Sequence, residues 1–260
     1  SHSLAAETGG EIGVTTMTSL GHSLTFVSAG GLPQVVNGVD PTIYGTSGAN
    51  RINGTAGNDR IDAGAGRDAV YGGAGNDTFI ARNGDGHDTY FGGNGVDTLD
   101  MSAITTKVAV NLGSGSQFRG SATGGAGSDT LMGIENVVTG SGADTITAST
   151  AANVMAGGSG NDTFRFVSVA AANGDTILDF QAGDVLDLRG IDANSAARGN
   201  QAFTLVPGAI GASAQLMVTT EHRADGDYTV VHGNTGGSNA VEFKINIKGD
   251  HDLDATDFRF

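Results

Sequence analysis

The hydrophobic positions along much of this chain recur with a period of nine. Six nine-residue units lie within residues 45–100, with Ala81 and Arg82 inserted after the fourth, and four more lie within residues 124–165. The units approximate the template G-G-x-G-x-D-x-U-x, in which U is the single apolar residue. One apolar residue in nine is too sparse for the buried face of a helix. The ten U positions are Ile52, Ile61, Val70, Phe79, Tyr90, Leu99, Leu131, Ile146, Met155 and Phe164.

The template predicts a turn and then a short strand in every unit. Glycines at the first, second and fourth positions allow positive φ and tight turns. Residues seven to nine form a strand whose apolar side chain points inward, so two units make one coil and successive coils stack as parallel strands. The predicted fold class is therefore all-β, a parallel β-roll.

The flanking segments predict further strands. Residues 1–44 contain apolar stretches without a helical period, and we expect an N-terminal cap or the tail of an upstream domain there. The roll is predicted over residues 45–180. Apolar segments separated by turn residues then predict a mostly antiparallel C-terminal β cap over residues 181–260. Helix is expected only near Val169 and Ile191.

Charge and composition narrow the range of partners. The chain has 28 acidic and 13 basic residues, a formal net charge of −15, which disfavours nucleic acid and anionic membranes. It has no cysteine, so disulfides and thiolate zinc sites are excluded. No stretch approaches the roughly 20 apolar residues of a transmembrane helix. Aspartate far outnumbers glutamate, which suits short cation ligands carried on turns.

The sixth position of the template predicts calcium ligands. Calcium takes roughly six to eight oxygens at about 2.3–2.6 Å from carboxylates and carbonyls, and two stacked turns can supply them. Because two units make one coil, alternate units share an edge. We therefore expect one edge to carry Asn50, Asp68 and Asp88, the other to carry Asp59, Asp77 and Asp97, and Asp144 to face Asp162. The predicted metal ligands, side chains and glycine carbonyls together, are Asn50, Gly57, Asp59, Gly66, Asp68, Gly73, Gly75, Asp77, Gly86, Asp88, Gly93, Gly95, Asp97, Gly127, Asp129, Gly142, Asp144, Asn153, Gly158, Gly160, Asp162, Asp175 and Asp179.

Calcium binding and folding are expected to be coupled. Two carboxylates about 5 Å apart repel by roughly 3 kcal/mol at an effective dielectric constant near 20, so the metal-free roll should be loose. Asn50 and Asn153 offer only a neutral oxygen. We therefore expect weaker calcium binding at the N-terminal edge of the first block of repeats (residues 45–100), which carries Asn50. We expect the same in the middle of the second block (residues 124–165), which carries Asn153.

These repeats closely resemble the repeats-in-toxin, or haemolysin-type calcium-binding, family. Residues 173–192 (NGDTILDFQAGDVLDLRGID) and 241–260 (VEFKINIKGDHDLDATDFRF) resemble the C-terminal domain of serralysin-type metalloproteases, and similar ends occur in calcium-binding modules of mannuronan epimerases. The resemblance implies several bound calcium ions and export by a type I secretion system that reads an uncleaved C-terminal signal. It also implies that folding is deferred until calcium is met outside the cell. The ending Asp257–Phe260 resembles such a signal.

The sequence shows no catalytic centre. Its six histidines lack the H-E-x-x-H spacing of a serralysin-like zinc protease. We therefore predict a non-enzymatic calcium-binding domain of a secreted protein, outside the cell or at its surface, whose other partners are the type I secretion machinery and an upstream passenger domain. The alternative is an extracellular binding or assembly module of a surface-layer, adhesin or polysaccharide-binding protein, in which calcium bridges copies or ligands. A basic or aromatic stripe along the roll would favour that alternative.

Overall fold

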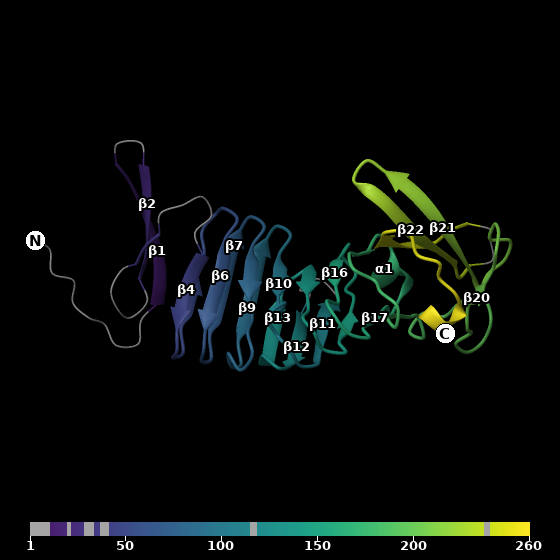
Figure 1. The fold of residues 1–260 in the computed structure, drawn as a ribbon, viewed down its shortest axis with the longest axis horizontal. Coiled ribbons are helices and arrows are strands. Elements are labelled where there is room, and N and C mark those ends of the chain that lie inside the picture. The colour runs from purple at the N-terminus through teal and green to yellow at the C-terminus, as the bar shows by residue number, and fades with distance from the viewer. Residues whose placement is uncertain (1–10, 20–21, 29–33, 37–41, 115–118, 237–239) are drawn as a thin grey trace, which may run out of the picture.

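Two β-sheets run side by side along the long axis of the molecule (Figure 1). The computed structural model describes residues 11–19, 22–28, 34–36, 42–114, 119–236 and 240–260. Strands of successive repeats alternate between a 13-stranded sheet and an 11-stranded sheet. This is the parallel β-roll that the nine-residue period predicts.

Each sheet has its own set of strands. Along the roll the 13-stranded sheet contains β5 (Arg51–Asn53), β7 (Ala69–Ala74), β9 (Thr89–Asn94), β13 (Gly127–Met132), β12 (Arg119–Gly124), β11 (Val108–Ser114), β15 (Thr145–Thr147), β17 (Thr163–Arg165), β19 (Val185–Asp187) and β24 (Phe258–Arg259). The 11-stranded sheet contains β4 (Thr42–Thr46), β6 (Arg60–Gly64), β8 (Thr78–Ile80), β10 (Thr98–Asp100), β14 (Asn136–Val138), β16 (Val154–Ala156), β18 (Thr176–Ile177), β23 (Phe243–Lys248), β22 (Gly226–Asn234), β21 (Gln215–Arg223) and β20 (Thr204–Leu205). At the N-terminal end, β1 (Glu11–Ser19) pairs in parallel with β5 and antiparallel with β2 (His22–Ser28), which pairs with β3 (Gln34–Val36).

Neighbouring coils pair in parallel and in register. In one sheet Ile52 lies opposite Val70, and Val70 opposite Tyr90; in the other, Ile61 lies opposite Phe79. All ten U side chains are fully buried, and the rings of Phe79 and Tyr90, from opposite sheets, are 5.5 Å apart. Complete burial of such a side chain contributes about 1.5–3 kcal/mol. The U residues are therefore the hydrophobic core of the roll.

A β-hairpin interrupts the parallel series in the 13-stranded sheet. Strand β12 pairs antiparallel with both β11 and β13, while β11 pairs in parallel with β15 and β13 with β9. In the other sheet β10 pairs directly with β14, so the roll continues through Ile134 to Val138. The hairpin itself was not predicted. Buried residues of the inserted segment extend the core, among them Met101, Ile104 and Val110.

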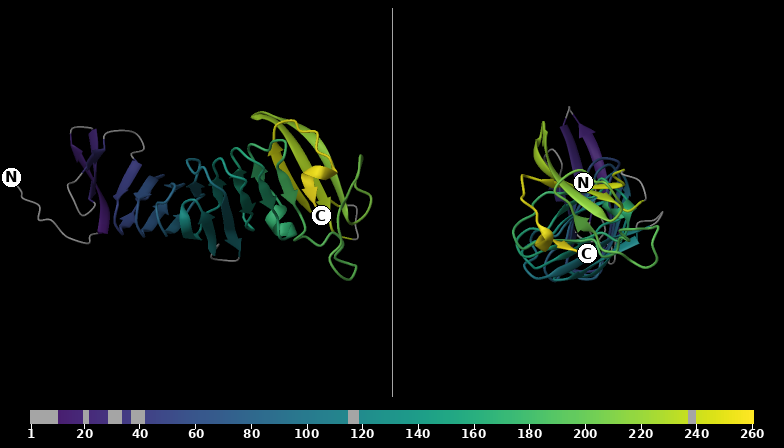
Figure 2. Two further views of the ribbon diagram at one scale, coloured as in Figure 1. Left: turned by 60° about the horizontal axis from the view of Figure 1, so that its bottom comes forward. Right: turned by 90° about the vertical axis from the view of Figure 1, so that its right-hand side faces the viewer.

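The C-terminal end combines parallel and antiparallel pairing. Strands β21, β22 and β23 are antiparallel to one another, as expected for a cap, and lie at the end of the roll opposite β1 and β2 (Figure 2). However, β18 pairs in parallel with β23, and β17 with β19, which pairs in parallel with β24. The boundary predicted after residue 180 lies within this parallel series. The roll is therefore completed by the last strand described.

Helix is scarce, as expected. The helix predicted near Val169 is present as α1 (Val169–Ala172), capped by Ser168, and a short 3₁₀ helix, η1 (Ala255–Asp257), precedes β24. The helix predicted near Ile191 is absent, and that prediction was wrong. The side chain of Asp192 accepts the amides of Asn194 and Gln201, which favours a turn over a helix. Among the described residues, no helix is long and apolar enough to cross a membrane.

Candidate metal sites in the turns

Sixth-position side chains of alternate repeats form a hydrogen-bonded ladder along one edge of the roll. The amide of Asp59 donates to Oδ1 of Asp77 at 2.8 Å, and the amide of Asp77 donates to Oδ1 of Asp97 at 2.8 Å. The next acceptor is Glu135, whose Oε2 receives the amide of Asp97 at 2.9 Å. Each acidic side chain is therefore held by the backbone of the preceding coil.

The opposite edge repeats this geometry. The amide of Asn50 donates to Oδ1 of Asp68 at 2.6 Å. The amide of Asp68 donates to Oδ1 of Asp88 at 2.8 Å, and that of Asp88 to Oδ1 of Asp129 at 2.9 Å. The two edges are thus occupied by the alternate repeats that the period predicts.

The ladders resume beyond the inserted hairpin. The amide of Asp144 donates to Oδ1 of Asp162 at 2.8 Å, and the amide of Asp162 donates to Oδ1 of Asp184 at 2.8 Å. On the other edge, the amide of Asn153 donates to Oδ1 of Asp175 at 2.8 Å. Asp144 and Asp162 are therefore neighbours, in agreement with the sequence pattern.

The second oxygen of most ladder carboxylates is buried and has no hydrogen-bond partner among the described residues. These oxygens are Oδ2 of Asp68, Asp77, Asp97, Asp129, Asp144, Asp162 and Asp175. A buried polar atom without a partner costs about 1–3 kcal/mol, and more when it is charged, so these oxygens fit a bound cation. No three His, Asp or Glu side chains converge on one point in the described part of the chain. A cation here would complete its shell with turn carbonyls.

Two family models match the sequence. Residues 44–79 match the RTX calcium-binding nonapeptide repeat, and residues 90–260 match the peptidase M10 serralysin C-terminal model, which covers more than half of the chain. The chain belongs to the serralysin C-terminal family. Its RTX repeats bind calcium, so calcium is the cation for which these turns are built. Neither model is that of the serralysin catalytic domain.

Two solved structures are also similar to this serralysin-type domain. The AlgE6R3 subunit of the Azotobacter vinelandii mannuronan C5-epimerase is 21% identical, with 83% of this chain and 80% of that chain covered and a TM-score of 0.29. The extracellular lipase LipA of Serratia marcescens is 16% identical, with 85% of this chain and 42% of that chain covered and a TM-score of 0.30. No curated protein matches the sequence. The family assignment therefore rests on the two family models.

Three predicted ligands of the serralysin-type roll differ from the carboxylates with a free Oδ2, because their side chains accept hydrogen bonds within their own turns. Oδ2 of Asp59 accepts the amide of Thr55 at 2.6 Å, and Oδ1 of Asn50 accepts the amide of Thr46 at 2.7 Å. Asn153 makes the same contact with Ser149 at 2.7 Å. Each of these turns has Thr or Ser at its second position, where the template has Gly. These turns therefore offer fewer free oxygens to calcium than the glycine-type turns.

Burial raises the pKa of the free turn carboxylates. The pKa is about 6 for Asp68, Asp97 and Asp162. It is about 7 for Asp129 and Asp175. The chief cause is that burial disfavours the charged form, and neighbouring carboxylates add to it at all of these positions except Asp175. Such a carboxylate favours a proton or a cation as its partner.

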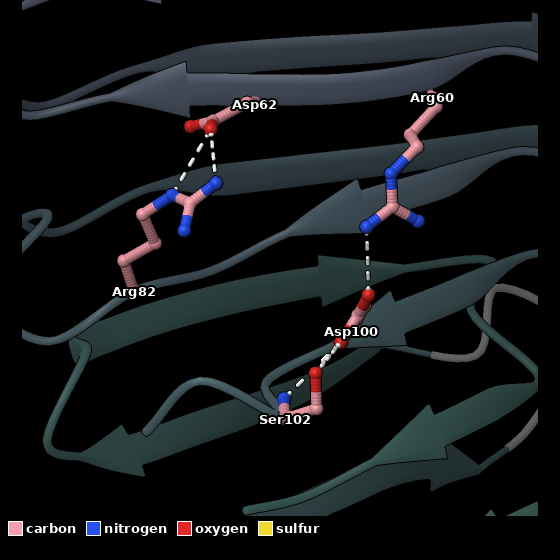
Figure 3. Close-up of polar contacts among 5 residues, drawn as sticks. All are labelled: Arg60, Asp62, Arg82, Asp100 and Ser102. Atoms are coloured by element: carbon pink, nitrogen blue, oxygen red, sulfur yellow. Dashed lines mark hydrogen bonds and ion pairs between the residues drawn. The ribbon is translucent and has the colours of Figure 1, made fainter. Parts of the chain in front are cut away.

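Aspartates on the outer face of the 11-stranded sheet are paired differently (Figure 3). Oδ2 of Asp62 accepts from Nε and Nη2 of Arg82 at 3.0 and 2.7 Å. Asp100 accepts from Arg60 at 3.1 Å and from the hydroxyl of Ser102 at 2.6 Å. Burial alone would raise the pKa of Asp100, but these hydrogen bonds outweigh it and hold the pKa below its usual value. Protein groups satisfy these carboxylates, which separates them from the calcium turns.

The predicted glycine ligands lie in the turns at both edges or, for Gly73, Gly93 and Gly127, near the ends of β7, β9 and β13. The φ angle is positive at Gly66, Gly73, Gly75, Gly86, Gly93, Gly95, Gly127, Gly158 and Gly160, but not at Gly57 and Gly142. A Cβ added to Gly86 would overlap the carbonyl oxygen of Gly66, the equivalent residue of the preceding coil. Stacked turns are therefore too close for a side chain there. Ligation by the individual carbonyls stays a prediction.

Asp179 is placed differently from the other predicted ligands. Its Oδ1 accepts the amide of Gly157 at 2.9 Å, and its Oδ2 accepts the amide of Gly158 at 2.8 Å. The side-chain nitrogen Nε2 of Gln181 donates to the carbonyl oxygen of Gly158. Both oxygens of Asp179 therefore hold the backbone of the turn that precedes Asp162.

Three acidic residues outside the predicted set belong to these turns. Glu135 and Asp184 continue the ladders, and each stands two residues before a fully buried apolar residue, Val137 and Leu186. A search for the triplet acid-x-apolar would have identified both residues. The search for the full template missed them, because the template glycines are absent there. Asp85 lies at the third, variable position of its unit, where the template gives no signal.

Proposed function

We propose that this chain is a calcium-dependent folding and export module at the C-terminal end of a secreted protein. In the metal-free state the buried carboxylate oxygens of the ladders oppose folding, and calcium outside the cell removes that opposition. The two-row core adds little to compensate, because each repeat strand buries one U residue. Folding of the roll would then report the presence of calcium.

The single observation that carries this proposal is the series of seven buried Oδ2 atoms that have no hydrogen-bond partner among the described residues. Ordinary proteins satisfy nearly all buried polar atoms. A series of unsatisfied carboxylate oxygens at one repeat position indicates a folded state that is complete only with cations. Coupling of metal binding to folding follows from the same logic, because the unfolded chain has no preformed site.

The position of the C-terminal residues supports export before folding. Strand β24 pairs with β19, Phe258 is buried, and the rings of Phe258 and Phe260 stack with centroids 5.5 Å apart. A secretion signal in Asp257–Phe260 would thus be fully accessible to a type I exporter in the unfolded chain, whereas folding buries its Phe258. Low calcium inside the cell would keep the signal exposed until export.

We further infer that the domain is not itself catalytic and that an upstream passenger carries the activity. Both matching family models describe the calcium-binding repeat or the serralysin C-terminal region. The acidic clusters are accounted for by the ladders. The division into residues 1–44, a roll over residues 45–180 and a cap over residues 181–260 stays a proposal about folding units, with β19 and β24 continuing the parallel series of the roll into the cap.

Calcium titration of the metal-stripped protein tests the proposal. Circular dichroism should show a cooperative gain of β signal, and calorimetry should show several ions bound with dissociation constants of about 10⁻⁴–10⁻³ M, the range of extracellular modules. Magnesium at the same concentration is the control, because it demands a smaller octahedral site. A full β spectrum in chelator, unchanged by calcium, would refute calcium-triggered folding.

A second candidate function is extracellular binding of a polysaccharide. On the outer face of the 13-stranded sheet the rings of Tyr71 and Phe91 stack at 4.5 Å, and the guanidinium of Arg51 lies 4.2 Å from the Tyr71 ring centroid. Met132 lies beside Phe91, and Arg119 beside Met132. This stripe is the feature that favours a binding module. Affinity electrophoresis in alginate, with Tyr71→Ala as the variant, tests it; equal mobility with and without alginate would exclude it.

A further inference from the structure

Asp88 is an exception among the glycine-type turns because its second oxygen is engaged. The hydroxyl of Tyr90 donates to Oδ2 of Asp88 at 3.2 Å, and Tyr90 is fully buried at a U position. The other nine U residues carry no hydroxyl. The oxygen that faces the cation in the equivalent turns is therefore drawn toward the core at this one.

A second carboxylate enters the same turn. The inserted residues Ala81 and Arg82 lengthen this turn, and Asp85 lies inside it with only 6% of its surface exposed. Oδ2 of Asp85 accepts the amide of Arg82 at 2.6 Å, whereas Oδ1 is buried without a partner among the described residues. Asp85 therefore presents a free oxygen in the turn where Asp88 lacks one.

The facing turn supplies a matching oxygen. Asp129 holds the amide of Asp88 with Oδ1 and leaves Oδ2 buried and free. Burial, followed by the charges of Asp85 and then Asp88, raises the pKa of Asp129 to about 7. The two free oxygens belong to adjacent turns of one edge.

The basic groups nearest in sequence do not neutralise this cluster. Arg82 directs its guanidinium to Asp62 on the outer face of the sheet (Figure 3). Nδ1 of His87 accepts the amide of Ser128 at 3.0 Å and is bonded to neither of the two free oxygens. A cation from solution is therefore the natural partner of the free oxygens.

We propose that Asp85 replaces Asp88 as the calcium ligand of this turn, so that Oδ1 of Asp85 and Oδ2 of Asp129 are the carboxylate oxygens of one calcium site. The hydroxyl of Tyr90 withdraws Asp88, and the two-residue insertion brings in Asp85. The turn keeps its number of carboxylate ligands, and the buried hydroxyl gains an acceptor. The inference rests on calcium binding by the RTX repeats and not on the export role.

Calorimetric titration with calcium chloride of four metal-stripped proteins tests this exchange: the wild type, Asp85→Asn, Tyr90→Phe and the double variant. Asp85→Asn keeps an acceptor for the amide of Arg82 but removes the charge. We expect it to weaken one site by about tenfold or more, because ligand charge sets calcium affinity. Tyr90→Phe should leave all sites near wild-type affinity. The double variant should recover most of the loss, because Oδ2 of Asp88 is released.

Terbium luminescence gives a reading specific to this site. Tyr90 lies beside the carboxylates and should sensitise emission from terbium bound there. In Asp85→Asn that emission should appear only at about tenfold higher terbium concentration, again because ligand charge sets affinity. Circular dichroism in saturating calcium checks that each variant is folded.

Two outcomes would overturn the exchange. If Asp85 only caps its turn through Oδ2, Asp85→Asn will bind calcium as the wild type does. If Asp88 is no substitute, the double variant will bind no better than Asp85→Asn. Failure of the proposed function is distinguishable, because it would appear as a wild-type protein that folds fully without calcium, whatever the affinities of the variants.

Discussion

The amide of Asp77 donates a hydrogen bond to Oδ1 of Asp97 at 2.8 Å, while Oδ2 of the same Asp97 is buried and has no partner in the part of the chain that the structure describes. One oxygen thus joins adjacent coils, and the other is left for a cation. The two oxygens have opposite consequences for the metal-free protein, since the first stabilises stacking and the second opposes burial. Substitutions that separate the two roles should therefore act differently with and without calcium.

Asp97→Asn separates them, because asparagine keeps the acceptor oxygen and removes the charge. In saturating calcium we expect one ion to bind about tenfold more weakly, since ligand charge sets affinity, and the melting temperature to fall. In metal-free buffer we expect the melting temperature to rise, because a buried, uncompensated charge is removed. Melting followed by circular dichroism in both buffers measures the two effects.

Asp62→Asn is the matched control for this experiment. Asp62 is bound to Arg82 at the outer face, so its loss should cost about 1 kcal/mol or less. The cost should have the same sign with and without calcium, and the number of bound ions should not change. If Asp97→Asn instead lowered the melting temperature equally in both buffers, the ladder carboxylates would have only a structural role.

Gly86→Ala tests how closely the turns are stacked. Gly86 has a φ of +136°, and an added Cβ would overlap the carbonyl oxygen of Gly66. The left-handed backbone costs alanine about 1–2 kcal/mol. The overlap adds to that cost, so we expect a loss of more than about 3 kcal/mol in the free energy of unfolding in calcium. Urea denaturation in calcium measures it.

Gly48→Ala is the control, since no atom lies within 4 Å of its added Cβ and its φ is not positive. We expect its stability to differ from that of the wild type by less than about 1 kcal/mol. If Gly86→Ala were as stable as Gly48→Ala, the coils would not approach each other too closely for a Cβ at position 86.

Phe258→Ala tests whether the last strand completes the roll. Phe258 is buried on β24 and lies opposite Leu186 of β19. Truncation of a buried phenylalanine costs about 3–5 kcal/mol, so the urea midpoint in calcium should fall clearly. Leu178→Ala, at a side chain that is 41% exposed, is the control and should have little effect. A wild-type midpoint for Phe258→Ala would show that the roll is stable without β24.

Much of the fold was predictable because one residue position in nine decides it. Ile52, Phe79 and Leu99 were identified as core from their period, and the structure buries all of them completely. The ladders followed from the same period, since two units per coil place Asp59, Asp77 and Asp97 on one edge. Once the repeat is found, the turn residues and the short strands are compatible with few folds other than a roll.

Features that depend on contacts between distant residues were not predictable in this way. The hairpin of β11 and β12 depends on pairing with β13 and β15, and no periodic signal marks it. Glu135 takes a ladder position without the template glycines. In the sequence Tyr90 is one more residue at a U position. Only the structure shows that its hydroxyl donates to Asp88.

The raised pKa values of the ladder carboxylates predict opposite pH dependences with and without calcium. In the folded, metal-free protein the pKa is about 6 at Asp97 and about 7 at Asp129 and Asp175, against about 3.9 in an unfolded chain. The folded state therefore binds more protons than the unfolded state between about pH 4 and pH 7. Since stability then falls as pH rises, these groups should stabilise the metal-free roll most at about pH 4, and that stability should be lost progressively up to about pH 7.

With calcium bound, the order reverses, because protons compete with the cation for the same oxygens. The melting temperature in saturating calcium should be highest near pH 7–8 and should fall as pH drops below about 6, where protonation displaces the metal. Metal-stripped protein, prepared without chelator so that chelation does not vary with pH, should show the opposite slope over the same range. Melting curves from pH 4.5 to 8 in both conditions measure this. A metal-free melting temperature that rises from pH 5 to pH 8 would show that the buried carboxylates do not hold raised pKa values, and the ladder would then lack the electrostatic strain that calcium is proposed to relieve.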